Sequence, residues 1–234
     1  ADSSSDLIFK IYGLMETIKG YGIQFDPNTA QAYLTIPHNP SLKPALSEQL
    51  RISANVIWAS MTGNHFIYES DGTFAKGFRI YSAGTTLLFY LYHSDSTSSH
   101  LEYDMTGMEL GKLYNIEFRV LNTGLDNRIE LYIDGVFVKG QNLSSLADIS
   151  YSTNGGFIGN SYGSDGLFHG RISDVQLWKG STLISYWEMK EGTGFTIYDK
   201  MGTQNLTGHV TTPYAFWTRD VPWGEPRSMK LTVT

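Results

Sequence analysis

Two carboxylates at alternate positions of one segment come closest to a catalytic pair. Glu102 and Asp104 flank Tyr103, and side chains two residues apart on a β-strand project from the same face. A retaining glycosidase holds its two carboxyl groups about 5 Å apart, which is near the spacing of such a pair. The next carboxylate, Glu109, lies beyond Thr106-Gly107, which breaks the period. We therefore interpret the pair as a solvated strand edge and predict no catalytic residue.

A second motif has the spacing of a nucleophile elbow. Gly159-Asn-Ser-Tyr-Gly163 matches Gly-x-Ser-x-Gly, which supports catalysis only at a turn from a strand into a helix, with an acid and a histidine further along the chain. Here Ser164-Asp-Gly166 follows, and then another strand pattern. We interpret the motif as a glycine-rich loop. The six histidines show no metal-ligand spacing such as His-Glu-x-x-His.

Side chains around this loop could instead bind a sugar. An aromatic ring packs against the C–H face of a sugar, while neighbouring polar groups pair with the hydroxyls. The loop and its flanks supply two aromatic rings, a carboxylate and an imidazole, and the predicted carbohydrate-binding residues are Tyr162, Asp165, Phe168 and His169. The alternative for each of these residues is a place in the core or an interface.

The clearest structural signal is a hairpin. In residues 128–133, Ile129, Leu131 and Ile133 alternate with polar residues, which predicts a strand with one apolar face. Asp134-Gly135 tolerates the positive φ angles of a two-residue turn, and residues 136–138 return as the partner strand. In a later strand, 168–178, the same alternation predicts that Val175 and Leu177 face away from Ile172 and Trp178.

Similar strand patterns recur at intervals of roughly ten residues, with Gly, Ser or Asp clusters between them and no long helical pattern. The sequence thus predicts an all-β protein, an antiparallel β-sandwich jelly roll. Residues 1–20 form a short helical or irregular N-terminal arm, residues 21–210 the sandwich, and residues 211–234 a C-terminal tail that packs on the sandwich or on a partner.

Composition excludes several classes of partner. The net charge of −6 and a pI near 5.5 argue against nucleic acid, because no basic face would meet the phosphates. No apolar run reaches the ~20 residues that a membrane-spanning helix needs, so we expect no membrane insertion. The absence of cysteine excludes disulfides and thiolate metal sites.

Four segments together carry a family resemblance. They are Phe25-Asp26 with Tyr33-Leu-Thr-Ile-Pro37; Leu131-Tyr-Ile-Asp-Gly135; Phe168-His-Gly-Arg-Ile-Ser-Asp-Val-Gln-Leu-Trp178; and Tyr186-Trp-Glu-Met-Lys-Glu-Gly-Thr-Gly194 with Tyr198-Asp-Lys-Met-Gly202. The chain resembles the laminin-G-like branch of the concanavalin A-like lectin/glucanase superfamily. The resemblance implies a jelly roll with one concave face, and many relatives bind glycans or proteins.

The resemblance also implies calcium as a candidate ligand. Asp174 and Asp199 match family positions near a calcium ion, and oxygen ligands of this kind suit that metal. The alternative for Asp199 is a structural one, in which its carboxylate closes a turn by accepting hydrogen bonds from backbone amides.

From these observations we predict a non-catalytic, lectin-like carbohydrate-binding module for recognition or adhesion. Its partner would be a glycan or a surface protein, and its location extracellular or on a virion surface. Two alternatives remain: a structural, decoration or fibre protein of a phage or virus particle, and a polysaccharide hydrolase or lyase. The N-terminal arm and the tail further suggest a homo-oligomer or a larger assembly.

Overall fold

The computed structural model describes residues 21–25, 32–161, 166–209 and 217–219. The predicted N-terminal arm and most of the predicted tail lie outside these residues. The described elements are β1 (Tyr21–Phe25), β2 (Tyr33–Ile36), η1 (Pro40–Leu42), η2 (Leu46–Glu48), β3 (Leu50–Trp58), β4 (Asn64–Glu69), β5 (Phe78–Ala83), β6 (Thr86–Tyr92), β7 (Ser98–Asp104), β8 (Leu113–Asn122), β9 (Asn127–Ile133), β10 (Val136–Asn142), β11 (Gly156–Ile158), β12 (Gly170–Lys179), β13 (Thr182–Trp187), β14 (Thr196–Ile197), β15 (Leu206–His209) and β16 (Trp217–Arg219).

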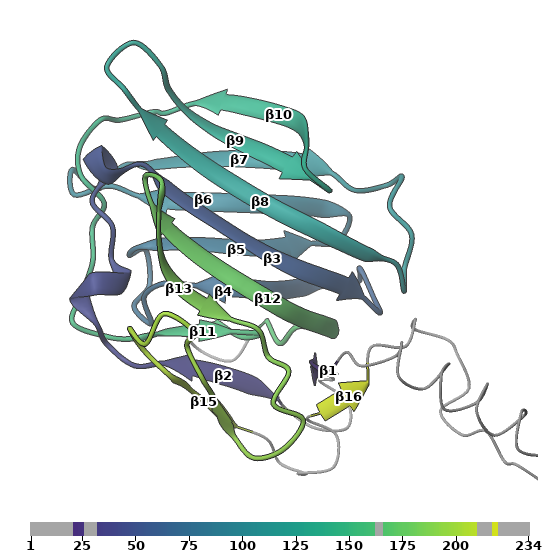
Figure 1. Cartoon of the computed structure of the whole chain (residues 1–234). Coiled ribbons are helices and arrows are strands. Elements are labelled where there is room, and N and C mark those ends of the chain that lie inside the picture. The colour runs from purple at the N-terminus through teal and green to yellow at the C-terminus, as the bar shows by residue number, and fades with distance from the viewer. Residues whose placement is uncertain (1–20, 26–31, 162–165, 210–216, 220–234) are drawn as a thin grey trace, which may run out of the picture.

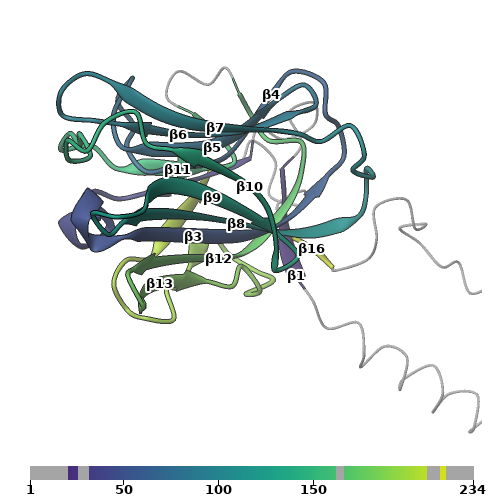
Figure 2. The same cartoon turned by 90° about the horizontal axis from the view of Figure 1, so that it is seen from above.

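These strands form two layered antiparallel sheets (Figures 1 and 2). The first sheet, here the β3 sheet, has the order β10-β9-β8-β3-β12-β1-β16, and β13 also pairs with β12. The second, here the β5 sheet, has the order β14-β15-β2-β11-β4-β5-β6-β7. The prediction of an all-β antiparallel sandwich is confirmed. Within the described residues, no helix is long and apolar enough to cross a membrane.

The predicted hairpin is present as β9 and β10. Val136 pairs with Ile133 across the turn, and Asp134 and Gly135 have φ angles of 52° and 77°. Positive φ at both central residues is what a type I′ turn requires. Ile129 and Leu131 are buried in the core, so the apolar row fixes which face of the hairpin points inward.

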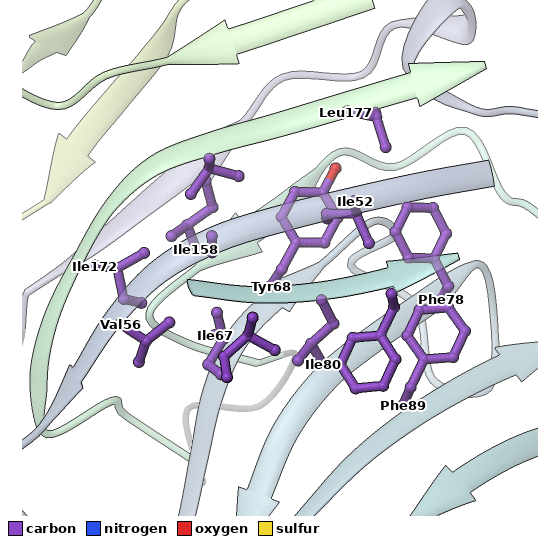
Figure 3. Packing of buried hydrophobic residues seen from close by; sticks show 14 of the residues in the cluster. Ile52, Val56, Ile67, Tyr68, Phe78, Ile80, Phe89, Ile158, Ile172 and Leu177 are labelled. Carbon is purple, nitrogen blue, oxygen red and sulfur yellow. The ribbon is translucent and has the colours of Figure 1, made fainter. Parts of the chain in front are cut away.

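The core fills the space between the two sheets with branched aliphatic and aromatic side chains (Figure 3). The ring centroids of Tyr68 and Phe78 are 5.4 Å apart in a stacked pair, and Phe78 also stacks on Phe89 with centroids 6.1 Å apart. Phe89 of the β5 sheet then stacks on Phe118 of the β3 sheet at 4.9 Å. This last contact joins the two layers directly, because the two rings come from different sheets.

The predicted alternation in β12 is wrong at one point. Ile172, Val175 and Leu177 all lie in the core, although we placed Ile172 on the opposite face. The pairing with β3 shifts register around Asp174, whose φ is 51°. A β-bulge adds one residue to a strand and so exchanges the faces of everything beyond it. Trp178 thereby turns outward, where it stacks under the Arg51 guanidinium at 4.1 Å.

The close approach of β11 to β4 gives a test of this packing. A Cβ on Gly156 would overlap the carbonyl oxygen of Glu69, whereas a Cβ on Gly107 would meet nothing within 4 Å. We expect Gly156→Ala to lower the free energy of unfolding by about 1–3 kcal/mol, the usual cost of overpacking. Gly107→Ala is the control and should change it by less than about 0.5 kcal/mol. Urea denaturation measures both, and equal stabilities would contradict the described packing of β11.

Candidate functional site

The outer face of the β5 sheet carries a row of stacked rings. Phe66 stacks on Tyr81 with centroids 4.8 Å apart, Tyr81 lies 6.0 Å from Tyr90, and Tyr90 stacks on His100 at 5.0 Å. Tyr92 lies 6.0 Å from Tyr90 on the same strand. These five residues, which we call the aromatic ladder, cross β4, β5, β6 and β7 in spatial order (Figure 1).

Strand pairing explains the row. Phe66 lies directly opposite Tyr81, and Tyr90 lies directly opposite His100, and residues in such pairs share one face of a sheet. Leu87, Phe89 and Leu91 of β6 point into the core, so the alternating positions Tyr90 and Tyr92 must point outward. The tyrosines are half-buried and His100 is exposed, while Phe66 keeps only 8% of its surface accessible.

An ion pair lies within the ladder. The Arg79 Nη2 and Glu69 Oε1 atoms are 3.0 Å apart, and the Glu69 side chain is fully buried. The Arg79 guanidinium also lies 4.9 Å from the centre of the Tyr92 ring and 6.0 Å from that of Phe66. Cation–π attraction of this kind supplements the ion pair. Both charges are thus compensated inside the described face.

The hydroxyls of Tyr81 and Tyr92 in the ladder stay protonated at neutral pH. Burial raises the pKa of Tyr81 to about 12, and the neighbouring Tyr90 and Tyr92 add to the shift while Arg79 opposes it. Burial likewise raises the pKa of Tyr92, against the opposing charge of Arg79. A neutral phenol both donates and accepts a hydrogen bond. The ladder therefore combines flat apolar rings with uncharged polar groups.

A second group of rings lies on the same face, further along the sheet. Tyr33 stacks on His209 at 4.8 Å and meets Phe157 edge-on at 6.1 Å. Thr35 Oγ1 lies 3.1 Å from Nε2 of His209, which fixes the orientation of the imidazole. We call Tyr33, Phe157 and His209 the β2 cluster. Phe157 pairs with Glu69 of β4, so the β2 cluster and the ladder share the outer face.

Two of the four predicted carbohydrate-binding residues, Phe168 and His169, lie in the part of the chain that the structure describes. Tyr162 and Asp165 lie outside the described residues. Phe168 is fully buried, with its ring 6.1 Å from that of Phe25 and 6.3 Å from that of Trp58, so it has no ring face available for a sugar. The Phe168 ring is part of the hydrophobic core. His169 is half-buried, and its ring centre lies 6.4 Å from that of His65.

The carboxylate of Asp199 is already saturated with hydrogen bonds. Oδ1 accepts from the backbone amides of Tyr186 and Met201, and Oδ2 accepts from the Gln204 amide and the Ser185 hydroxyl. Four donors occupy the four lone-pair positions of a carboxylate. Asp199 therefore closes a turn through backbone amides, as the structural alternative predicted.

Asp174 is the other predicted calcium ligand, and both of its carboxylate oxygens also accept hydrogen bonds from protein groups. Oδ1 accepts from the Tyr186 hydroxyl at 2.8 Å and lies 3.1 Å from Lys190 Nζ, and Oδ2 accepts from Asn55 Nδ2 and Ser173 Oγ. Among the residues that the structure describes, no three or more His, Asp or Glu side chains group as metal ligands. The two aspartates do not fit a calcium site, because donors already hold their oxygens.

The outer face of the β3 sheet has a different chemistry. Glu117 accepts from Arg51 at 2.7 Å and from Arg119 at 2.5 Å, and Glu130 pairs with Arg128 at 2.6 Å. Both carboxylates are buried and form ion pairs with arginines. The network holds neighbouring strands together, and its arginines also lie over aromatic rings, Arg119 at 4.0 Å from the ring centre of Tyr132 and Arg51 at 4.1 Å from that of Trp178. The rings on this face are therefore paired with cations, whereas those of the ladder stack mainly on one another.

Sequence reasoning missed the aromatic ladder. The signal was present in β6, where Tyr90 and Tyr92 alternate with apolar residues. We took such tyrosines as structural, because the pairing of β6 with β5 and β7 depends on long-range contacts. Without that register, Phe66, Tyr81 and His100 are isolated aromatic residues in separate strands.

Comparison with known proteins places the fold in a family. A laminin G-type model of the concanavalin A-like lectin/glucanases superfamily matches residues 28–183. The chain belongs to this superfamily. No curated protein matches it.

Among solved structures, a Bacteroides ovatus protein assigned to carbohydrate binding superposes with a TM-score of 0.63 at 14% identity, over 87% of this chain and 61% of its own. This chain therefore spans less than two thirds of the length of the Bacteroides ovatus protein. Ruminococcus gnavus IT-sialidase CBM40, bound to α2,3-sialyllactose, has a TM-score of 0.52 at 14% identity, over 69% of this chain and 89% of its own. The binding domain of botulinum neurotoxin serotype G has a TM-score of 0.51 at 13% identity, over 68% and 39%. At these identities the likeness shows the fold alone.

The saturation of Asp199 gives a test of the calcium question. We expect Asp199→Ala to lower the free energy of unfolding by at least about 2 kcal/mol, because buried donors lose their acceptor. Asp104→Ala, which removes an exposed carboxylate that accepts hydrogen bonds from the amide and hydroxyl of Thr106, should cost less than about 1 kcal/mol. Calcium and a chelator should leave the melting temperature of the wild-type protein unchanged. A rise in melting temperature with calcium concentration would show a site that binds the folded state and would contradict this account.

Proposed function

We propose that this protein is a non-catalytic carbohydrate-binding module and that its ligand lies on the aromatic ladder. The observation that carries the proposal is the stack from Phe66 through Tyr81 and Tyr90 to His100 on the outer face of the β5 sheet. Three of these rings keep accessible surface, since Tyr81 and Tyr90 are half-buried and His100 is exposed, and apolar surface gathered in one place on an outer face is a feature of binding sites. The superfamily and the fold neighbours support a glycan as the ligand.

The chemistry of the ladder suits a sugar. A sugar ring presents an apolar C–H face that packs on a flat aromatic ring, and its hydroxyls need both donors and acceptors. The phenols of Tyr81 and Tyr92 supply both, and the exposed Glu102 carboxylate beside His100 supplies an acceptor. Because the rings are held by their neighbours, little side-chain entropy is lost on binding.

The carboxylates at the edge of this face do not favour catalysis. Glu102 and Asp104 lie on β7 and are both exposed. The hydrogen bond from Thr106 Oγ1 holds the pKa of Asp104 below its ordinary value, whereas a general acid needs a raised pKa and a desolvated position. We therefore propose binding without bond cleavage.

A module of this kind would serve recognition or adhesion at an extracellular or virion surface. The alternative of a decoration or fibre protein of a phage or virus particle stays a prediction, because it rests on the N-terminal arm and the tail. A lectin-like module on such a particle would use the same ladder.

Substitution in the ladder tests the proposal. We expect Tyr90→Ala to weaken glycan binding at least tenfold, which corresponds to about 1.4 kcal/mol, because Tyr90 contacts three other rings of the ladder. Phe137→Ala, which removes a half-exposed ring from β10 on the other sheet, is the matched control and should leave affinity unchanged. The measurement is a glycan array followed by calorimetry on the bound glycan. Equal losses in the two variants, or no binding by the wild type across a broad array, would contradict the proposal.

The hydrolase alternative has its own test. We expect no release of reducing sugar from polysaccharides by the wild-type protein, and no difference between it and Glu102→Gln. Release that disappears in Glu102→Gln, while that variant still binds the polysaccharide, would establish catalysis and overturn the non-catalytic proposal.

A further inference from the structure

One row of paired residues crosses the whole outer face of the β5 sheet. Strand by strand from β14 to β7, its members lie directly opposite one another: Thr196, Thr207, Thr35, Phe157, Glu69, Arg79, Tyr90 and His100. Directly paired residues share a face. The aromatic ladder and the β2 cluster therefore lie on the same face of one sheet, with Phe157 and the buried Glu69–Arg79 pair between them.

The accessible rings of the two groups are too far apart for one sugar ring to contact both. Phe157 of β11 and Phe66 of β4 lie on neighbouring strands, but Phe66 is only 8% exposed. Three strand spacings separate the half-buried Tyr33 of β2 from the half-buried Tyr81 of β5, which amounts to about 14 Å at about 4.8 Å per spacing. The β2 cluster has its own stacked pair, Tyr33 and His209, at 4.8 Å, and His209 is exposed. A ligand that uses both groups must be a chain that runs across the strands.

Charge on this face selects against acidic ligands. The only strand cation among the described residues of the row is Arg79, and Glu69 compensates it at 3.0 Å. At the β7 edge, Glu102 and Asp104 add two exposed carboxylates. The β2 cluster contributes rings and an imidazole, with the hydroxyls of Thr35 and Thr207 beside it. A carboxylate or sulfate on the ligand would find no uncompensated arginine or lysine among these strand residues.

We infer that the outer face of the β5 sheet binds a neutral glycan chain lying across the strands, with the ladder as one subsite and the β2 cluster as a second. The inference rests on the proposed function and specifies its ligand class. It also separates this chain from Ruminococcus gnavus IT-sialidase CBM40, whose bound sialyllactose is acidic. Affinity must then increase with chain length until both subsites are filled.

Calorimetry with defined oligosaccharides tests this. The probes are cello-, malto-, xylo- and manno-oligosaccharides from disaccharide to octasaccharide, with oligogalacturonides and sialyllactose as acidic counterparts. We expect at least one neutral series to bind, with affinity rising at least tenfold from its shortest to its longest member. The acidic counterparts should bind at least tenfold more weakly than neutral chains of equal length.

Variants assign the two subsites. Tyr33→Ala and, as a second variant at an exposed position, His209→Ala should reduce the affinity of the longest chain to that of the shortest and leave the shortest unchanged. Tyr90→Ala should weaken every length. Affinity independent of length, no effect of either β2-cluster variant, or a preference for acidic chains would overturn the inference while leaving glycan binding by the ladder intact. Failure of every neutral and acidic chain to bind would overturn the proposed function itself.

Discussion

The structure depends on burial of one side-chain row from each sheet in a shared core. Phe89 from one sheet stacks on Phe118 from the other at 4.9 Å, and a slip of one residue in either strand would expose this contact to solvent. The inner row thus fixes the register of β6 against its neighbours. Once that register is fixed, the positions of the outward-facing side chains are fixed as well, because they alternate with the core residues. Tyr90 must then lie opposite His100. The arrangement of the aromatic ladder is therefore a consequence of the core.

The two outer faces divide the polar chemistry of the protein. On the β3 sheet, arginines and glutamates compensate one another, as Glu117 does between Arg51 and Arg119. On the β5 sheet, neutral rings and phenols predominate, and the Arg79 charge is balanced by Glu69. On a face whose charges are already paired, a ligand adds little binding free energy, whereas covering half-exposed rings removes apolar surface from water. This contrast is why we assign binding to one sheet and strand cohesion to the other.

Local chemistry made the fold predictable from the sequence, and long-range register limited the prediction of the site. The Asp134-Gly135 turn needs only two residues with positive φ, so its hairpin was evident. The bulge at Asp174 has no such local signal, and the alternation beyond it was predicted on the wrong face. Phe168 illustrates the same limit, because its sequence neighbours indicate a loop aromatic while its spatial neighbours, Phe25 and Trp58, bury it. A site built from four paired strands cannot be assembled until their pairing is known.

The central claim is that a glycan contacts the outer face of the β5 sheet. Nuclear magnetic resonance of the aromatic side chains, recorded while a neutral oligosaccharide is added, measures that contact directly. This account predicts shifts in the ring resonances of Tyr81, Tyr90 and His100, with those of Tyr132 and Phe137 on the other sheet unchanged. Shifts confined to the β3 sheet or to the 159–166 loop, with the ladder resonances unmoved, would contradict it.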